Sequence, residues 1–388
     1  MPWTTPAASG ATVHIWNGYS LAERDRRWNA VRANAAKAGM DCIFVPLGNG
    51  VDGRYLTQLR CSAMVLPTDG RAPMVIADRR SSNAWVPEPW QTGREWAEPM
   101  GEALLDLGMQ RARIGVAGLK GGSVSHCTSI DGVVNHTAFE YVMSKLPNAT
   151  FEDATDLVGV VRYVKSDEEI SFVRQSTEVA TAGIDELIKL ARPGVDAGVL
   201  YADVLGRLIE LRSEYFPLAL TIDAIGTEKP TRYSNPPLGR RLEPNALITN
   251  EVNAIRGAQL TQVCQPILLG KIPDAWKPLI ELHKEVYEAG LATIKPGTTF
   301  GALTELVDGL GVKRGVKSVV QLHGPDVARR AVLPVLIYGR HAHILWRPTR
   351  LSADRFAAFG SLASRGYASE RADLRVAINP PFVVAKAS

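Results

Sequence analysis

Residues 246–270 read ALITNEVNAIRGAQLTQVCQPILLG, and this stretch decides how the rest of the chain is interpreted. Two runs rich in Ile, Leu, Val and Thr flank Arg256-Gly257, a pair that predicts a tight β-hairpin turn. With those two residues as the loop, Glu251 lies directly opposite Gln262 on the same face of the hairpin. A carboxylate facing an amide between apolar strands is either a functional pair or a polar pair on a solvated sheet face.

Length and composition set the class of protein. The chain has 388 residues, which gives room for two domains, and its hydrophobic content of 46% allows an ordinary core. It contains no apolar run of about 18 residues, so we expect no membrane span. The first ten residues lack a basic region followed by an apolar one, so no secretory signal is expected. The four cysteines are scattered without metal-type spacing, which favours a reducing cytoplasm.

The charge of the chain is unevenly distributed. The formal net charge is +4, but residues 325–388 hold 10 of the 44 Lys and Arg and only 4 of the 40 Asp and Glu. The rest of the chain is therefore close to neutral, and the C-terminal segment supplies the excess positive charge. Its basic residues are dispersed among Ala, Leu and Pro without a cluster, so no nucleic-acid partner is expected.

The first part of the chain alternates helix and strand patterns. A helix is expected over 20–40, because Ser20 can cap it, Glu23 follows as in a capping box and Gly39 can end it. The other expected elements are strands at 41–47, 62–66, 73–77 and 113–116 and a helix at 97–108. This order predicts an α/β domain over residues 1–160. The segment contains no Gly-rich phosphate loop.

The second part shows a repeated pattern on either side of the hairpin. Ser166-Asp167-Glu168-Glu169 forms a capping box that opens a long helix, which Arg192-Pro193-Gly194 stops. The expected elements that follow are a helix at 196–213 and a strand at 218–225, and after the hairpin helices at 274–294 and 300–310 and a strand at 316–322. Two copies of a helix, Pro-Gly, helix and strand unit indicate an internal duplication around a central sheet.

These features together resemble the creatinase / aminopeptidase P / methionine aminopeptidase superfamily, also called M24. The matching features are the capping-box helix after Val164-Lys165, the two Pro-Gly stops, the hairpin ending in Leu269-Gly270 and the pair His323-Gly324. The resemblance implies a creatinase-like α/β N-terminal domain over 1–160. It also implies an α+β pita-bread domain with internal pseudo-two-fold duplication over 161–388.

The superfamily's peptidases hold two metal ions with Asp, Asp, His, Glu and Glu, and this chain departs from that pattern. The two Asp positions, eleven residues apart on the hairpin, are Glu251 and Gln262 here. The metal-binding His matches His323, and a substrate-facing His is replaced by Ser234. The segment after His323 contains one Glu, Glu370. One Glu, one His and one amide do not offset the charge of two divalent ions, so we expect no metal pair.

The resemblance implies a hydrolase, Xaa-Pro aminopeptidase-like by fold, that cleaves a C–N bond of the amide, peptide or amidino type in a small molecule or short peptide. Creatinase shows that the fold can do this without metal, so no cofactor is expected. One or two divalent ions, Mn or Co, are the alternative. A catalytically inactive member that keeps the fold and ligand binding is the alternative function. A cytoplasmic homodimer is expected.

Six residues are candidates for the site. Glu251 and His323 are the expected catalytic residues, since His titrates near neutrality, and each is otherwise a structural polar residue. The expected substrate-binding residues are Gln262, Arg54, Tyr55 and Ser234. Gln262 can instead serve only to bond Glu251, and a surface role is the alternative for Arg54 and Tyr55.

Residues 325–388 do not continue the superfamily pattern. The stretch 356–375, FAAFGSLASRGYASERADLR, has no clear helix or strand period. One explanation is a reading-frame change near codon 325, because Arg-, Ala- and Pro-rich text is typical of GC-rich DNA read out of frame. The other is a diverged C-terminal segment. Translation of all three frames of the resequenced gene after codon 324 distinguishes the two.

Overall fold

The computed structural model divides into two compact units. The first comprises the chain up to Leu119 together with Val133–Leu157, and the second comprises 120–132 together with the chain from Val158 onward. The structure describes residues 18–48, 50–59, 62–77, 83–92, 95–121, 132–224, 239–263, 265–293, 300–315, 318–323, 343–348, 360–363 and 383–385.

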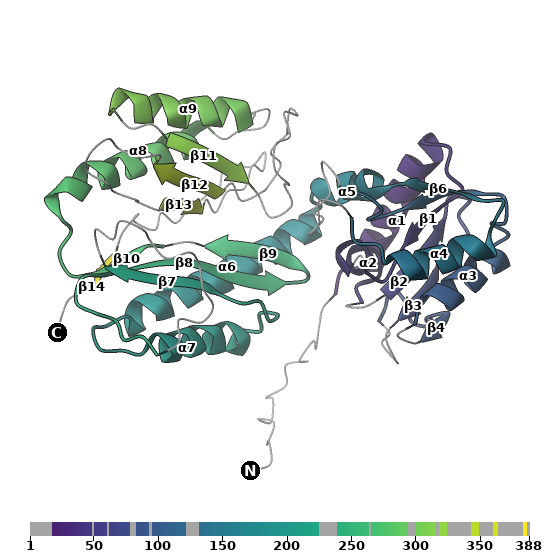
Figure 1. Ribbon diagram of the computed structural model, residues 1–388, viewed down its shortest axis with the longest axis horizontal. Helices are drawn as coiled ribbons and strands as arrows, with labels where there is room; N and C mark the ends of the chain where they lie inside the picture. Colours follow the sequence, from purple (N-terminus) through teal and green to yellow (C-terminus); the bar gives the residue numbers. More distant parts are fainter. Residues whose placement is uncertain are drawn as a thin grey trace, which may run out of the picture. The chain divides into compact units, whose positions relative to one another are not determined.

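The first unit is built on a six-stranded mixed sheet with the strand order β4-β3-β2-β1-β5-β6 (Figure 1). Its strands are β1 (Cys42–Val45), β2 (Ser62–Pro67), β3 (Met74–Ala77), β4 (Gln91–Thr92), β5 (Arg113–Val116) and β6 (Thr150–Asp153). Its helices are α1 (Leu21–Lys37), α2 (Gly50–Thr57), α3 (Ala97–Asp106) and α4 (His136–Lys145). Helix α5 (Thr155–Tyr163) follows at the end of this unit.

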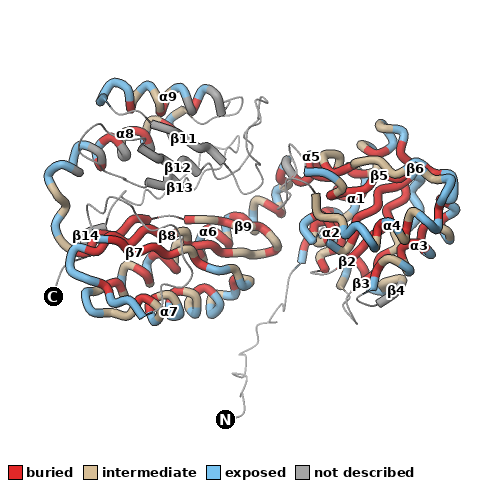
Figure 2. Tube along the Cα trace, in the orientation of Figure 1, coloured by how far each residue is buried: buried red, intermediate tan, exposed pale blue. Residues whose placement is uncertain are grey.

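The central strands of this sheet are buried on both faces, as Figure 2 shows by colour. Cys42 and Phe44 pack with α3 and α4 in one hydrophobic cluster. Side chains alternate along a strand, so Ile43 and Val45 point to the other face, where α1 contacts β1. Covering helices on two faces explain why these strands read as continuous apolar runs rather than alternating ones.

The predicted start of α1 is confirmed in part. The Ser20 hydroxyl accepts a hydrogen bond from the Glu23 backbone N–H at 3.1 Å, as a cap requires. The Glu23 carboxylate, however, bonds Arg26 and Arg27 instead of closing a capping box. The expected end is confirmed, because Gly39 has a φ of +72° just beyond the helix.

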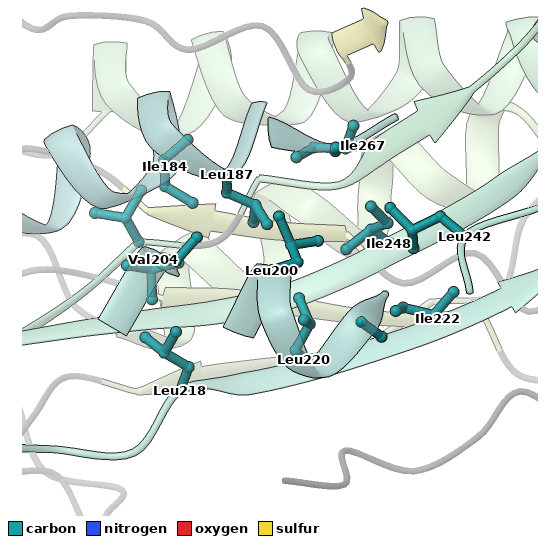
Figure 3. Packing of buried hydrophobic residues seen from close by; sticks show 14 of the residues in the cluster. Ile184, Leu187, Leu200, Val204, Leu218, Leu220, Ile222, Leu242, Ile248 and Ile267 are labelled. Atoms are coloured by element: carbon teal, nitrogen blue, oxygen red, sulfur yellow. The ribbon is translucent and has the colours of Figure 1, made fainter. Parts of the chain in front are cut away.

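The second unit begins with two helices and a twisted sheet, as the sequence predicts. The elements are α6 (Asp167–Leu190), α7 (Ala197–Glu210), β7 (Ala219–Ala224), β8 (Ala246–Arg256), β9 (Gln259–Val263) and β10 (Ile267–Leu269). The Ser166–Glu169 capping box is present in full. Helices α6 and α7 lie on one side of the sheet (Figure 1), and Figure 3 shows Ile184, Leu200 and Val204 packed against Leu220 and Ile248.

The hairpin forms at the predicted place, but the predicted turn is wrong by one residue. Arg256 pairs with Gln259, so the loop is Gly257-Ala258 rather than Arg256-Gly257. Both loop residues have positive φ, +54° and +60°. Such a turn matches the right-handed twist of the flanking strands. The change moves the register by two residues, and Asn253, not Glu251, lies directly opposite Gln262.

The expected duplication of helix, helix and strand is confirmed in the order of elements. After the short 3-10 turn η1 (Asp274–Trp276) come α8 (Lys277–Thr293), α9 (Phe300–Lys313) and β11 (Ser318–His323). Strand β11 pairs with β12 (His343–Pro348), which pairs with β13 (Gly360–Ala363), while β14 (Val383–Ala385) pairs with β10. Within the described parts of the chain, no helix is long and apolar enough to cross a membrane.

Candidate functional site

The sheet of the second unit has two chemically different faces. Leu220, Ile248 and Val252 belong to the apolar cluster against α6 and α7. Because side chains alternate along strands, residues at the intervening positions project from the opposite face. That face, here called the polar face, is made by β7, β8 and β9. It carries Ala219, Thr221, Asp223, Leu247, Thr249, Glu251, Asn253, Ile255, Leu260 and Gln262.

Glu251 and Gln262 meet on the polar face in spite of the shifted register. A shift of two residues keeps both side chains on the same face, and Glu251 becomes the diagonal neighbour of Gln262. Long side chains span this diagonal, and the Gln262 side chain hydrogen-bonds the Glu251 carboxyl. Both residues are half-buried. The predicted contact is therefore present, although the residues are not directly opposite.

Burial raises the pKa of Glu251 above its usual range, and the hydrogen bond from Gln262 opposes that shift only in part. The reason is that desolvation penalises the charged form, and a neutral amide supplies no charge to offset the penalty. A raised pKa brings the acid and base forms of Glu251 closer to equal population near neutrality. A shift in this direction favours a role in proton transfer.

Two asparagines of β8 fix the strand that carries Glu251, and the sequence analysis did not single them out. The Asn250 amide donates to Gln265 O at 2.6 Å and accepts from Gln265 N at 3.2 Å, which holds the connection to β10. The Asn253 amide lies 3.4 Å from Pro217 O. Both asparagines are buried. Polar residues inside an apolar strand are the sequence signal that marks them, since such groups are rarely buried unbonded.

Three residues singled out in the sequence contribute no described side chain. His323 is the last residue of β11, where its backbone pairs with His343 of β12. Ser234 and Glu370 lie outside the described residues, as does most of the segment 325–388. The roles assigned to His323 and Ser234 therefore stay predictions.

Arg54 and Tyr55 lie on α2 of the first unit, whereas Glu251 and Gln262 belong to the second. Tyr55 is buried, so the alternative of a surface role is wrong for it. The Arg27 guanidinium lies 4.1 Å from the centre of the Tyr55 ring, and the Tyr55 hydroxyl accepts a hydrogen bond from Arg26 at 3.3 Å. These contacts place Tyr55 in the core of the first unit, and a role in substrate binding stays a prediction.

The described side chains do not fit a pair of divalent metal ions. A dinuclear site needs several carboxylates to offset about four positive charges. Glu251 is bonded to the neutral amide of Gln262, which supplies no charge to offset a bound cation. Among the described residues, no group of three or more His, Cys, Asp and Glu is placed to hold a metal ion.

Comparisons with known proteins agree with the architecture. No family model matches the chain. An uncharacterized hydrolase/peptidase of Sinorhizobium fredii is 25% identical over 301 residues, which cover 72% of this chain and 74% of that protein. Creatinase of a Bacillus species is 23% identical over 297 residues, 72% of this chain and 68% of its own.

The solved structure of an Xaa-Pro dipeptidase from Bacillus anthracis superposes with a TM-score of 0.71. It is 15% identical and covers 88% of this chain and 94% of its own. The resemblance to the creatinase and aminopeptidase P superfamily is thereby confirmed, and the chain has the pita-bread fold of that superfamily.

Proposed function

We propose that this chain is a metal-independent hydrolase that cleaves a C–N bond, of the amide, peptide or amidino type, in a small molecule or short peptide. The single observation that carries the proposal is the half-buried Glu251, which has a raised pKa and is bonded to the neutral Gln262. The names of the relatives, hydrolase/peptidase, creatinase and Xaa-Pro dipeptidase, support hydrolysis of a C–N bond.

The proposed reaction needs proton transfer at two points. Water adds its oxygen to the carbon of the C–N bond and loses a proton, and the departing nitrogen gains one. Glu251 takes up the proton from water and returns it to the leaving nitrogen, which a carboxyl with a pKa closer to neutrality does more effectively. Gln262 holds the Glu251 carboxyl in place, and His323 is the proposed second acid/base group.

The test is hydrolysis of an Ala-Pro dipeptide and of creatine by protein treated with a chelator, followed by addition of Mn²⁺ or Co²⁺. Release of free proline or of urea without metal supports the proposal. The Glu251→Gln variant should then lose about 10²- to 10⁴-fold in kcat, the usual contribution of a general acid/base. Glu210→Gln is the matched control, because Glu210 is exposed on α7 and should leave kcat unchanged.

Two results contradict the proposal. Cleavage that appears only after metal is added overturns metal independence. Absence of cleavage of every C–N substrate supports the alternative, an inactive member that keeps the fold.

We also propose a homodimer in the cytoplasm. Sedimentation equilibrium tests the dimer, and cell fractionation tests the location.

A further inference from the structure

Thr221 is a buried hydroxyl on the polar face that has no hydrogen-bond partner among the described residues. Its side chain is 3% exposed, and its Oγ1 atom has neither a backbone nor a side-chain partner. Buried hydroxyls are normally bonded, because an unsatisfied one loses its bonds to water without replacement. Such an exception calls for a physical explanation.

Other buried threonines in the chain show the ordinary behaviour. The Thr57 hydroxyl donates to Gly53 O at 2.7 Å, and the Thr177 hydroxyl donates to Val173 O at 2.8 Å. On β9, the Thr261 hydroxyl lies 3.4 Å from the same Val173 carbonyl. In each case a nearby carbonyl satisfies the hydroxyl. Thr221 lies in β7, which pairs with β8, and its side chain projects from the face of the sheet rather than along the ladder of backbone hydrogen bonds.

The position of Thr221 places it next to the candidate site. It pairs directly with Thr249 of β8 in the antiparallel ladder, so both side chains are on the polar face. Thr249 precedes Glu251 by two residues on the same strand and is also on that face. Thr249 is buried, whereas Glu251 and Gln262 are half-buried. The two hydroxyls therefore form the deeper continuation of the Glu251 site.

The charge of this face indicates which chemical group the hydroxyls receive. Its ionisable side chains in the described strands are Asp223 and Glu251, and none of its described residues is Lys or Arg. A face with acidic and hydroxyl groups accepts hydrogen bonds from N–H donors and disfavours an anion.

We propose that Thr221 and Thr249 form a ligand subsite whose hydroxyl oxygens accept hydrogen bonds from an N–H group, amide or amidinium, of the molecule bound at Glu251. This inference deepens the proposed function and rests on it for the identity of the ligand. Thr221 is a specificity-determining residue in this arrangement, and its missing partner is supplied by the ligand.

The test compares ligand affinity with stability in the variant Thr221→Val, which replaces the hydroxyl by a methyl group of similar shape. Calorimetric titration with an Ala-Pro dipeptide and with creatine measures affinity in the full chain. We expect about 3- to 10-fold weaker binding of the probe that binds, the usual loss for one hydrogen bond. The melting temperature without ligand should rise by about 2–4 °C, because an unbonded buried hydroxyl is removed.

Two further variants complete the design. Thr221→Ser keeps the hydroxyl and should bind the probe like the unmodified protein. Thr261→Val is the matched control, because Thr261 pairs with Ala254 on the opposite, helix-facing side of the sheet. It should leave affinity unchanged and should not raise the melting temperature, since its hydroxyl is bonded.

Unchanged affinity in Thr221→Val overturns the subsite, as does failure of the unmodified chain to bind either probe. A loss of affinity in Thr261→Val equal to that in Thr221→Val also overturns it. Binding that weakens in Thr221→Val without cleavage of either probe supports the subsite and contradicts the proposed hydrolase, so the two failures are distinguishable.

Discussion

Two glutamates in the two units of this protein have opposite surroundings. Glu23 in the first unit is buried and bonded to two guanidinium groups, with Arg26 Nε and Arg27 Nε both 2.7 Å from its oxygens. Glu251 in the second unit is half-buried and bonded to the neutral amide of Gln262. Burial alone would raise the pKa of either carboxyl. The two arginines reverse that effect and lower the pKa of Glu23, whereas the pKa of Glu251 stays raised.

The difference separates a carboxylate used for structure from one available for chemistry. Around Glu23 the charge is fully compensated, and Arg27 is further enclosed by Tyr19, Tyr55 and Trp85, with its guanidinium 4.1–5.1 Å from the ring centres. Glu251 lacks a charged partner among the described residues of its face, so burial keeps its pKa raised. A neighbouring positive charge strongly stabilises the ionised form of a buried carboxyl, whereas a neutral amide offsets the effect of burial on its pKa only in part.

The largest expected effect is on stability and concerns Arg27. Replacement by Met leaves the buried Glu23 without one of its two positively charged partners. This loss should lower the free energy of unfolding of the first unit by about 3–5 kcal/mol. Urea unfolding followed by tryptophan fluorescence measures it, since Trp28 and Trp85 lie in this cluster. Arg26→Met is the control. The Arg26 side chain is 37% exposed, and its loss should cost below about 1 kcal/mol. Equal costs for both variants would contradict the comparison.

A smaller effect is expected at the turn that sets the register of the Glu251 strand. A Cβ atom on Gly257 would lie 2.6 Å from the Phe172 ring, and the residue has a φ of +54°. Gly257→Ala should therefore cost about 2 kcal/mol or more. Ala258→Gly at φ +60° should instead stabilise by about 0.5–1 kcal/mol. Thermal unfolding measures both, and destabilisation by Ala258→Gly would show that residue 258 does not have a positive φ in the folded chain.

The variant Gln262→Glu places a second negatively charged carboxylate beside Glu251, in contrast to the two positively charged partners of Glu23. Two adjacent carboxylates repel, so the variant should be less stable at neutral pH by about 1 kcal/mol. The pair also supplies two oxygen donors, so Mn²⁺ should restore stability in the variant by mass action. The unmodified chain should show no such response. A Mn²⁺-dependent rise in its melting temperature would indicate that the donor set outside the described residues completes a metal site.

The smallest effect is the pH dependence of stability. The pKa of Glu251 is raised in the folded state, so above the usual pKa range of a glutamate the folded chain binds more protons than the unfolded chain. The contribution of Glu251 to the free energy of unfolding therefore falls as pH rises. For Glu23 the pKa is lowered, so its contribution falls as pH drops below the usual range. The measurement is urea unfolding at about pH 4 and pH 7.5. Relative to the unmodified chain, Glu251→Gln should be more stable at pH 7.5 than at pH 4, and Glu23→Gln should be less stable at pH 7.5 than at pH 4. The same sign for both variants would refute the comparison.

Local sequence determined the elements and their order. The capping box at Ser166, the Pro193-Gly194 stop and the apolar alternation of the central hairpin each act over a few residues. They predicted α6, the end of that helix, and the strands that carry Glu251 and Gln262. Side chains alternate along a strand with a period of two residues, which places Glu251 and Gln262 on one face of the sheet. The observed shift of the hairpin register by two residues does not change that face.

Tertiary structure decided the register of the hairpin and the state of its polar groups. The Ser176 hydroxyl of α6 donates to Gln259 O and accepts from Arg256 N, and Phe172 of the same helix packs on Gly257. These contacts come from residues about eighty positions earlier, which a local turn pattern does not include. The raised pKa of Glu251 likewise depends on burial, as does the Thr221 hydroxyl, which has no hydrogen-bond partner among the described residues. Burial is set by how the whole unit packs, so the sequence by itself determined which groups share the face, and only the fold decided how they are solvated.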